Sequence, residues 1–412
     1  MASVSHTSVD DAAQVVPLTE PSGGVPTVVD SPAVLASTID LFASGHGPVA
    51  VDAERASGYR YGQRAYLVQM RRAGAGTALI DPIALPDLSV LSAALGGAEW
   101  VLHAASQDLP CLAEVGLRPE RIFDTELAAR LLGYERVGLA AVVAQVLGLG
   151  LAKEHSAVDW STRPLPADWL RYAALDVEVL VDVRDQITTE LTSSGKAQWA
   201  AEEFEAERTA PPSPPRPDPW RRVSGVHDVK SPRGLAVVRE LWDVRDAQGR
   251  ERDIAPGRVL PDRAIVAAAS ALPRSQAELR GLPVFSGRRT SRRLDLWQAA
   301  IDRALALPAD RLPSVHGPRS DGPPPVRSWR DREPRAAARL AAARAGLLEL
   351  STACSVPVEN LLSPDLVRRL CWSPPRSVTS VSVAETLEAG GARPWQVGLT
   401  TDLLAKALTV SE

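Results

Sequence analysis

The stretch PVAVDAERASGYRYGQRAYLVQMRRAGAGTALID, residues 48–81, decides the fold of the N-terminal half of this 412-residue chain. It contains three apolar runs rich in β-forming residues, which end at Asp52, Gln69 and Asp81. The turn-prone segments between successive runs hold two glycines each. Short apolar runs separated by glycine-containing turns are typical of neighbouring strands. We therefore expect three consecutive strands that open a sheet.

Downstream of this stretch, the sequence alternates between strand-like and helix-like patterns. One further strand is expected at 100–103, and helices are expected at 88–95, 106–115, 125–132, 139–147 and 167–187. Strands first and helices later favour a mixed α/β sheet with helices packed against it.

Two proline-rich segments divide the rest of the chain. The clearer one is APPSPPRPDP, residues 210–219, and a second runs from 307 to 325. Proline lacks a backbone donor and favours an extended chain, so both segments are expected to be linkers. Helical periodicity with little strand signal predicts that each module after the first linker is a small all-α bundle. The expected parts are a disordered leader at 1–25, the α/β domain at 26–209, a linker at 210–225, a helical domain at 226–306, a linker at 307–329 and a second helical domain at 330–412.

Composition argues against several classes of protein. Hydrophobic residues make up 45% and charged residues 23%, as in soluble globular proteins. No apolar run approaches the roughly eighteen residues that a membrane span needs. The N-terminus has neither the basic start nor the apolar stretch of a signal peptide. The sequence therefore predicts a cytoplasmic protein that has no membrane partner.

Cysteine and histidine usage argues against a zinc enzyme. Cys111, Cys354 and Cys371 are too few and too widely spaced for a disulfide framework or a CxxC site. The six histidines form no H-x-x-x-H pair, which a zinc-binding helix would need.

The net charge of −4 hides an asymmetry along the chain. Residues 1–210 hold 15 Lys+Arg against 28 Asp+Glu, whereas residues 211–345 hold 26 against 15. Acidic groups can hold cations, and an arginine-rich region can hold a polyanion. An ordinary solvated surface would explain the same asymmetry.

Two candidate carboxylates, Asp52 and Glu54, lie in VAVDAERA at the end of the first strand. Residues two apart on a strand point the same way, so both can face one site. A third, Asp108 in HAASQDL, follows the strand at 100–103 and starts a helix. The helix dipole would favour an Asp there in any case, and a solvated strand end would explain the first pair.

Tyr172 and Asp176 form the third element, in WLRYAALDVEVL. Residues four apart lie on one face of a helix. A carboxylate on an apolar helix needs a partner or a metal, because an unpaired buried charge is costly.

Together these elements resemble the DEDD exonuclease superfamily, tyrosine subclass. The segments VAVDAERASGYRYGQRAYLVQ, VLHAASQDL and HSAVDWSTRPLPADWLRYAALDVEVL are similar to ribonuclease D of the actinobacterial type, and the similarity covers most of 45–205. Residues 226–306 and 330–408 resemble the paired HRDC (helicase and ribonuclease D C-terminal) domains of that family, the second less closely.

The resemblance implies a ribonuclease H-like fold and a 3′–5′ exonuclease that acts on RNA, in particular on tRNA precursors with 3′ extensions. Two divalent cations, Mg²⁺ or Mn²⁺, would be held by Asp52, Glu54, Asp108 and Asp176, with Asp52 bridging them. Tyr172 would orient the attacking water, because an ordinary tyrosine is a poor base at neutral pH. A chain that carries its own guiding modules could act as a monomer.

Four further residues are candidate substrate contacts: His103, Lys153, Arg163 and Arg258. A histidine at a strand end is as readily explained by a structural role. Weaker candidates are Arg55, Gln69 and His155. The first helical module would contact phosphates without reading sequence, through Arg288, Arg289, Arg292 and Arg293.

Three alternatives were weighed against this interpretation. An ATP-dependent helicase would need a phosphate-binding loop, but the Gly195-Lys196 pair is followed by Ala197 and lacks the upstream glycine. A non-catalytic RNA-binding scaffold is disfavoured, since all four carboxylates and the tyrosine are present. A DNA exonuclease stays open, because sugar selectivity depends on a contact that no motif announces.

Overall fold

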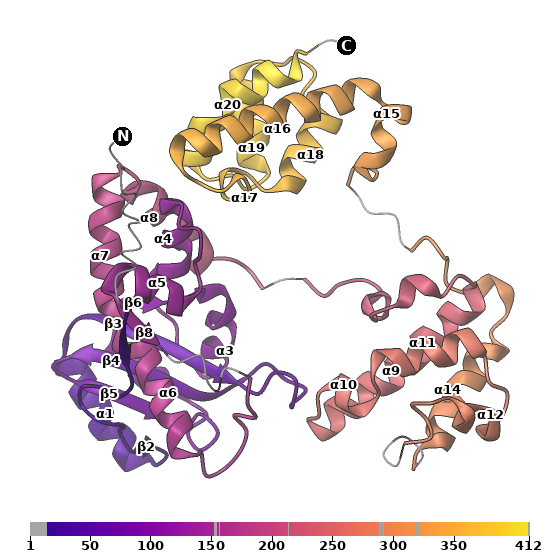
Figure 1. The fold of residues 1–412 in the computed structure, drawn as a ribbon, viewed down its shortest axis with the longest axis horizontal. Coiled ribbons are helices and arrows are strands. Elements are labelled where there is room, and N and C mark those ends of the chain that lie inside the picture. Colours follow the sequence, from indigo (N-terminus) through magenta and orange to yellow (C-terminus); the bar gives the residue numbers. More distant parts are fainter. Residues whose placement is uncertain are drawn as a thin grey trace, which may run out of the picture.

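The computed structural model describes residues 15–151, 155, 157–212, 214–287, 290, 292–317 and 322–410. Figure 1 shows three bodies in chain order: an α/β domain, a first helical domain and a second helical domain. The predicted fold class, a mixed sheet with flanking helices followed by two helical domains, is confirmed.

A six-stranded mixed sheet forms the centre of the α/β domain, in the order β2-β5-β4-β3-β6-β7. β4 runs antiparallel to β3 and β5, and the other pairs are parallel. The predicted meander is therefore confirmed as β3–β4–β5. The strands are β2 (Val28–Val29), β3 (His46–Arg55), β4 (Ala65–Ala73), β5 (Gly76–Ile80), β6 (Glu99–Leu102) and β7 (Arg121–Asp124).

Helices cover this sheet, so that Val49, Ala50 and Val51 of β3 are completely buried. They are α1 (Pro32–Ser44), α2 (Ser89–Ala94), α3 (Leu109–Glu114), α4 (Thr125–Leu132), α5 (Leu139–Leu147), α6 (Ala167–Glu178), α7 (Leu180–Ser193) and α8 (Ala197–Arg208), with the short 3₁₀ helix η1 (Ala105–Gln107) before α3.

The single helix predicted at 167–187 is wrong, because the chain breaks at Val179 into α6 and α7. The two helices have different partners: α6 packs on β3, β4 and β5, while α7 packs on α4 and α5 as well as on the sheet. A straight helix could not follow both surfaces.

The predicted disordered leader at 1–25 is only partly described. Residues 1–14 lie outside the described part of the chain. From there, β1 (Val16–Leu18) pairs in parallel with β8 (Leu149–Leu151), so this part of the leader is ordered, contrary to the prediction. Its backbone groups are satisfied by a strand that is distant in sequence, a pairing that local composition cannot reveal.

The two helical domains have separate apolar cores, in which Trp297 and Trp329 are almost completely buried. The first contains η2 (Pro219–Arg222), η3 (Val226–Asp228), α9 (Pro232–Arg252), α10 (Pro256–Val259), α11 (Asp262–Ala271), α12 (Gln276–Gly281), α14 (Leu294–Ala306) and η4 (Ala309–Arg311). The second contains η5 (Val326–Ser328), α15 (Trp329–Arg332), α16 (Pro334–Cys354), α17 (Val358–Leu361), α18 (Pro364–Trp372), α19 (Ser380–Ala389) and α20 (Pro394–Leu408).

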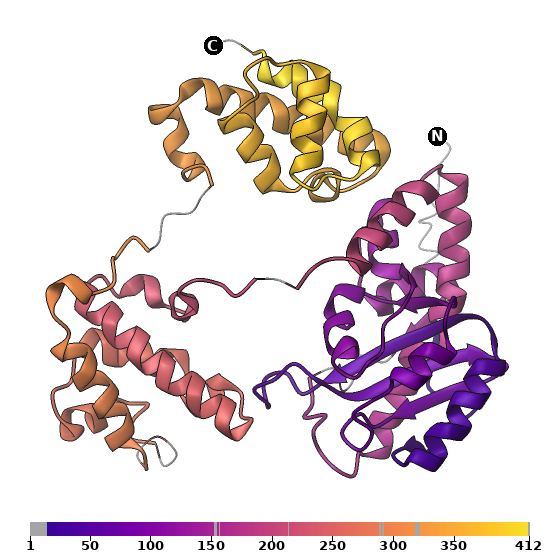
Figure 2. The same cartoon turned by 180° about the vertical axis from the view of Figure 1, so that it is seen from behind.

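Each helical domain contacts the α/β domain at a different place. The connection between β3 and β4 reaches the end of α9, where the Ala255 amide donates to the Tyr59 carbonyl at 3.0 Å (Figure 2). Helix α20 of the second helical domain packs on α8. Among the described helices, none has the length and apolarity that crossing a membrane would require.

Candidate active site

Asp52 and Glu54 lie near the C-terminal end of β3. Gln69 lies opposite Asp52 in the β3–β4 register, and its Nε2 donates to Asp52 Oδ2 at 3.3 Å. Gln69 is completely buried, so it can hold the carboxylate but cannot reach a phosphate in solvent. The sequence had suggested a weak phosphate contact for this residue.

Helix α6 supplies the second side of the cavity. Carboxylate oxygens of Asp52, Glu54 and Asp176 all lie within 4.8 Å of one another. Tyr172 lies one turn before Asp176 on the same helix face and lines the same cavity. Because α6 packs across β3, the helix and the strand bring these groups together.

Asp108 enters from a third element, at the residue before α3. It lines the same cavity as Asp52, whose negative charge opposes ionisation of the Asp108 carboxyl group and so helps to raise its pKa. Arg55 lies beside it, with Nη2 3.7 Å from Asp108 Oδ1 and Nη1 donating to the Gln107 carbonyl at 2.8 Å. The arginine therefore fixes the segment that carries Asp108.

The turn before Asp108 is held by Asp124, a residue that sequence reasoning missed. Its carboxylate accepts from the amides of Ala104 at 3.0 Å and Ala105 at 2.7 Å. Ala104 adopts a left-handed conformation, with φ of 61°, that needs such support. Asp124 follows an apolar strand as Asp52 does, and that position was the only available signal.

Burial dominates the electrostatics of the cavity. It raises the pKa of Asp108 to about 8, with the charge of Asp52 as the next cause. Burial, followed by the charge of Asp52, also raises the pKa of Glu54 and Asp176 well above their usual range. Such a cluster cannot carry its full charge alone, and oxygen-only donors suit hard divalent cations. The donor set therefore fits a metal site.

The carboxylates line an open cavity of about 420 Å³. It also contains Arg55, His103, Gln107, Glu126 and Tyr172. A neighbouring hollow of about 260 Å³ shares Tyr172 and Asp176 and extends to His155, Asp168 and Arg171. Residues from β3, η1, α4 and α6 thus surround a space that one nucleotide-sized group could enter.

The other candidate residues lie in different surroundings. His103 lines the cavity, but its Nδ1 is 2.8 Å from Thr125 Oγ1, and burial lowers its pKa. Arg163 is not brought to the cavity: it pairs with Asp81 at 2.7 Å and donates to main-chain carbonyls, including that of Tyr66.

Two further candidates cannot be placed at the cavity. Arg258 lies in the first helical domain, where its Nε donates to the Gly58 carbonyl at 2.6 Å. Lys153 lies outside the described residues, as do Arg288 and Arg289.

Three family models match the chain, one in each domain. Residues 26–192 match a model described as 3′-5′ exonuclease, residues 234–301 an HRDC domain, and residues 322–408 a 3′ to 5′ exonuclease C-terminal domain. The predicted second HRDC-like domain thus matches a separately described model. Fold and acidic cavity define a DEDD-type 3′–5′ exonuclease domain, a class that uses divalent metal ions.

Similarity to known proteins identifies the family of this chain. Ribonuclease D of Nitrobacter hamburgensis is 36% identical over 230 residues, which span 54% of this chain and 58% of that protein. Ribonuclease D of Escherichia coli is 31% identical over 272 residues, 64% of this chain and 71% of that protein. The crystal structure of the E. coli protein, an exoribonuclease involved in structured RNA processing, covers 93% of this chain and 98% of its own at 25% identity, with a TM-score of 0.66.

A crystal structure of a protein from Bifidobacterium adolescentis covers 96% of this chain and 100% of its own, with 39% identity and a TM-score of 0.87. The chain belongs to the ribonuclease D family. Its fold, domains and relatives are those of a 3′–5′ exoribonuclease.

Proposed function

We propose that this protein removes nucleotides from the 3′ end of RNA by metal-dependent hydrolysis at the cavity formed by Asp52, Glu54, Asp108, Tyr172 and Asp176. The observation that carries the proposal is the convergence of carboxylate oxygens from β3 and α6 within 4.8 Å of one another, with Tyr172 beside them. The cavity holds four acidic groups, of which Glu54, Asp108 and Asp176 are buried and Asp52 is half-buried, and such a cluster is costly to a fold unless it holds cations.

Asp52, Glu54, Asp108 and Asp176 would hold two divalent cations, with Asp52 in the bridging position because it neighbours each of the other three. When bound, two such cations lower the pKa of the attacking water and stabilise the leaving oxygen. We propose Mg²⁺ as the ion in the cell, with Mn²⁺ as a substitute, since both accept an all-oxygen site.

Tyr172 would position the attacking water and would not act as a base. Burial, followed by the charge of Asp176, raises the pKa of its hydroxyl further above the already high usual value. The hydroxyl therefore keeps its proton at neutral pH. Its oxygen lone pairs remain available to accept a hydrogen bond from the water.

RNA with a structured body and a single-stranded 3′ tail, such as a tRNA precursor with a 3′ extension, is the proposed substrate. Support comes from the E. coli relative, which is involved in structured RNA processing. We further propose that the protein acts as a monomer in the cytoplasm and without ATP. His103 and Lys153 remain candidate substrate contacts.

The test uses 5′-labelled RNA with a short 3′ tail, incubated with Mg²⁺, Mn²⁺ or EDTA. The wild-type protein should produce a ladder that shortens from the 3′ end, and Asp176→Asn should abolish it. Asp182→Asn, an exposed carboxylate on α7, is the matched control and should leave the ladder unchanged. Equal trimming of a matching DNA would overturn the RNA preference. Tight RNA binding without trimming by either cation would leave only a binding scaffold.

A further inference from the structure

A pocket of about 330 Å³ lies between the β3–β4 connection and the first helical domain. The α/β domain contributes Tyr59, Arg60 and Asp159 to its lining. The helical domain contributes Arg252, Arg258 and Arg293, together with apolar residues. Four guanidinium groups therefore face one carboxylate in a single hollow between two domains.

Neutral groups contact three of these arginines. Arg60 Nε donates to Ser161 Oγ at 2.7 Å, and Arg293 donates to the side chain of Gln248. Arg258 lies over the Tyr59 ring, 4.0 Å from its centroid. Contacts of this kind fix a guanidinium without neutralising its charge.

Carboxylate partners are scarce at this pocket. Within the described ranges of the chain, Arg60, Arg252 and Arg293 form no ion pair. The Asp159 Oδ1 accepts from the amide and the hydroxyl of Ser161. One carboxylate thus lines the pocket together with four arginines, of which Arg60, Arg252 and Arg293 form no ion pair within the described residues, and a polyanion would find several fork-shaped donors there.

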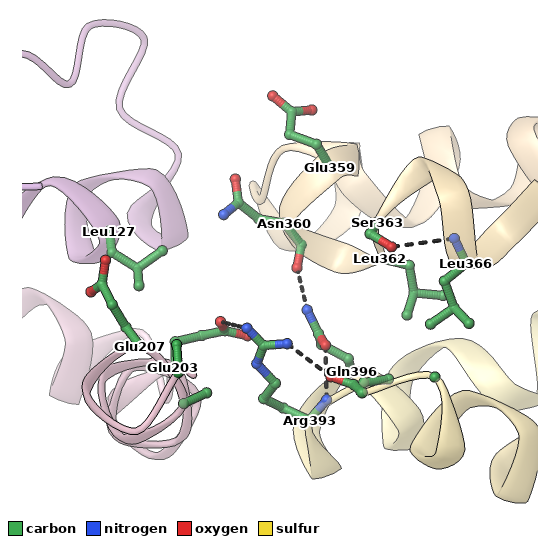
Figure 3. Close-up of a pocket in the computed structure, with 15 residues that line it drawn as sticks. Leu127, Glu203, Glu207, Glu359, Asn360, Leu362, Ser363, Leu366, Arg393 and Gln396 are labelled. Atoms are coloured by element: carbon green, nitrogen blue, oxygen red, sulfur yellow. Dashed lines mark hydrogen bonds and ion pairs between the residues drawn. The ribbon is translucent and has the colours of Figure 1, made fainter. Parts of the chain in front are cut away.

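The second interdomain pocket has the opposite charge. It is about 400 Å³ in volume and lies between α8 and the second helical domain (Figure 3). Its charged lining consists of Glu203, Glu207, Glu359 and Arg393, of which Glu203 and Arg393 already pair at 2.9 Å. Three carboxylates and one paired arginine would repel a phosphate chain, so only the first pocket suits one.

We propose that the arginine pocket binds the phosphodiester backbone of the RNA strand whose 3′ end occupies the carboxylate cavity. The inference rests on the proposed function and adds a second subsite to it. Arg60 follows Glu54 by six residues, so their Cα atoms are at most about 20 Å apart. At 3.4 Å per stacked nucleotide, that distance corresponds to about six nucleotides or fewer. The pocket can therefore hold phosphates only a few positions upstream of the 3′ end.

The decisive variant is Arg252→Gln, because this residue at the end of α9 is exposed and its side chain forms no hydrogen bond or ion pair within the described part of the chain. It is made in the Asp176→Asn protein, so that binding is measured without cleavage, on RNAs of two to twelve nucleotides. At about 0.1 M salt, loss of one single-strand phosphate contact should raise Kd roughly fivefold and lower the slope of log K against log salt by about 0.7. The ratio of variant to parent Kd should be close to one for the dinucleotide and should stop growing beyond about eight nucleotides.

Matched controls distinguish the loss of a positive charge from a change in folding. Arg263→Gln removes an exposed arginine on α11 of the same domain, outside the pocket, and should leave Kd unchanged. Arg252→Lys keeps the charge and should recover most of the binding. Thermal unfolding should be the same for all three variants.

Two results would contradict the proposal that this pocket binds the RNA backbone. Binding of the twelve-nucleotide RNA by Arg252→Gln as tightly as by Arg263→Gln would exclude a phosphate contact there. The same loss at every length, dinucleotide included, would indicate an indirect effect. Failure of the proposed function is seen separately, as wild-type protein that trims no RNA with either cation.

Discussion

The junction between the α/β domain and the first helical domain differs in chemistry from its junction with the second. The first is polar: Tyr61 donates through its hydroxyl to Asp246 at 2.9 Å and through its amide to Asp253 at 3.2 Å. Gly249 makes room for it, since a Cβ there would lie 3.0 Å from the Tyr61 ring.

The second junction is built around a tryptophan stack. The rings of Trp199 and Trp395 lie 4.9 Å apart at an interplanar angle of 15°. Trp395 Nε1 donates to Glu203 at 2.9 Å, and Lys196 Nζ donates to the Ser355 carbonyl at 3.4 Å. Glu203 and Arg393 form an ion pair across this junction, whereas Arg60, Arg252 and Arg293 at the first junction have no carboxylate partner within the described residues. The difference indicates that one junction is structural and the other can take part in binding.

The largest effect is expected from Trp395→Ala, which removes the stack and leaves Glu203 without its indole donor. Truncation of a buried tryptophan costs about 3–5 kcal/mol. Chemical denaturation should show that loss, with the second helical domain released first and becoming protease-sensitive. Trp220→Ala, in the first helical domain, should destabilise without releasing the second. A loss below about 1 kcal/mol would show that the stack does not hold the domain.

Divalent cations should stabilise the fold through the carboxylate cavity, by about 2.7 kcal/mol at a hundred times Kd. The pKa of Asp108, about 8, lies above its usual 3.8, so the stability due to its protonated form is present at low pH and is lost as pH rises through 8. Cations bind the deprotonated carboxylates, so the stabilisation that they provide increases as the pH rises. Mg²⁺ or Mn²⁺ should raise Tm more at pH 8 than at pH 5. An equal rise in Asp52→Asn would contradict binding at this cavity.

Glu207 links α8, and so the second junction, to the catalytic segment. Its Oε1 accepts from the Ser106 amide at 3.0 Å, and burial, followed by the charge of Asp124, raises its pKa to about 8. Glu207→Ala should lower kcat about 10- to 100-fold with little change in KM, as loss of a supporting carboxylate does at metal sites.

Two controls sharpen that measurement. Glu207→Gln keeps an acceptor for the Ser106 amide and should retain most activity. Glu205→Ala, on the exposed side of the same helix, should have no effect. A Glu207→Gln variant as impaired as Glu207→Ala would show that the carboxyl group acts in another way.

The smallest effect is expected at the polar junction. Tyr61→Phe deletes the hydrogen bond that the hydroxyl donates to Asp246 and the one that it accepts from Arg250, and should cost about 1–2 kcal/mol of unfolding free energy. Tyr134→Phe, which deletes a comparable bond to Glu190 inside the α/β domain, is the control. Only Tyr61→Phe should weaken the coupling between the α/β domain and the first helical domain, and separate unfolding transitions would show this. Identical unfolding profiles for both variants would remove the distinction between the junctions.

Local pattern was sufficient for much of this molecule. The β3–β4–β5 meander could be predicted because apolar alternation and glycine turns are local signals. Proline predicted both linkers in the same way, but η2 (Pro219–Arg222) and η4 (Ala309–Arg311) of the first helical domain lie inside the predicted bounds. Asp52, Glu54, Asp108, Tyr172 and Asp176 were candidates because each lies where a strand ends or on one helix face. The resemblance to the DEDD superfamily joined them into one set, and the structure brings that set to one cavity.

What the sequence alone could not provide are pairings between distant segments. Nothing local to Arg163 indicates that Asp81 takes its charge, and nothing near residue 207 indicates a bond to Ser106. The break at Val179 and the β1–β8 pairing also depend on surfaces supplied by other elements. The sequence by itself determined the elements and the chemistry they carry, because propensity and periodicity act over a few residues. Only the tertiary structure decided which charges are neutralised and which stay open to a ligand, because burial and electrostatic compensation depend on neighbours in space.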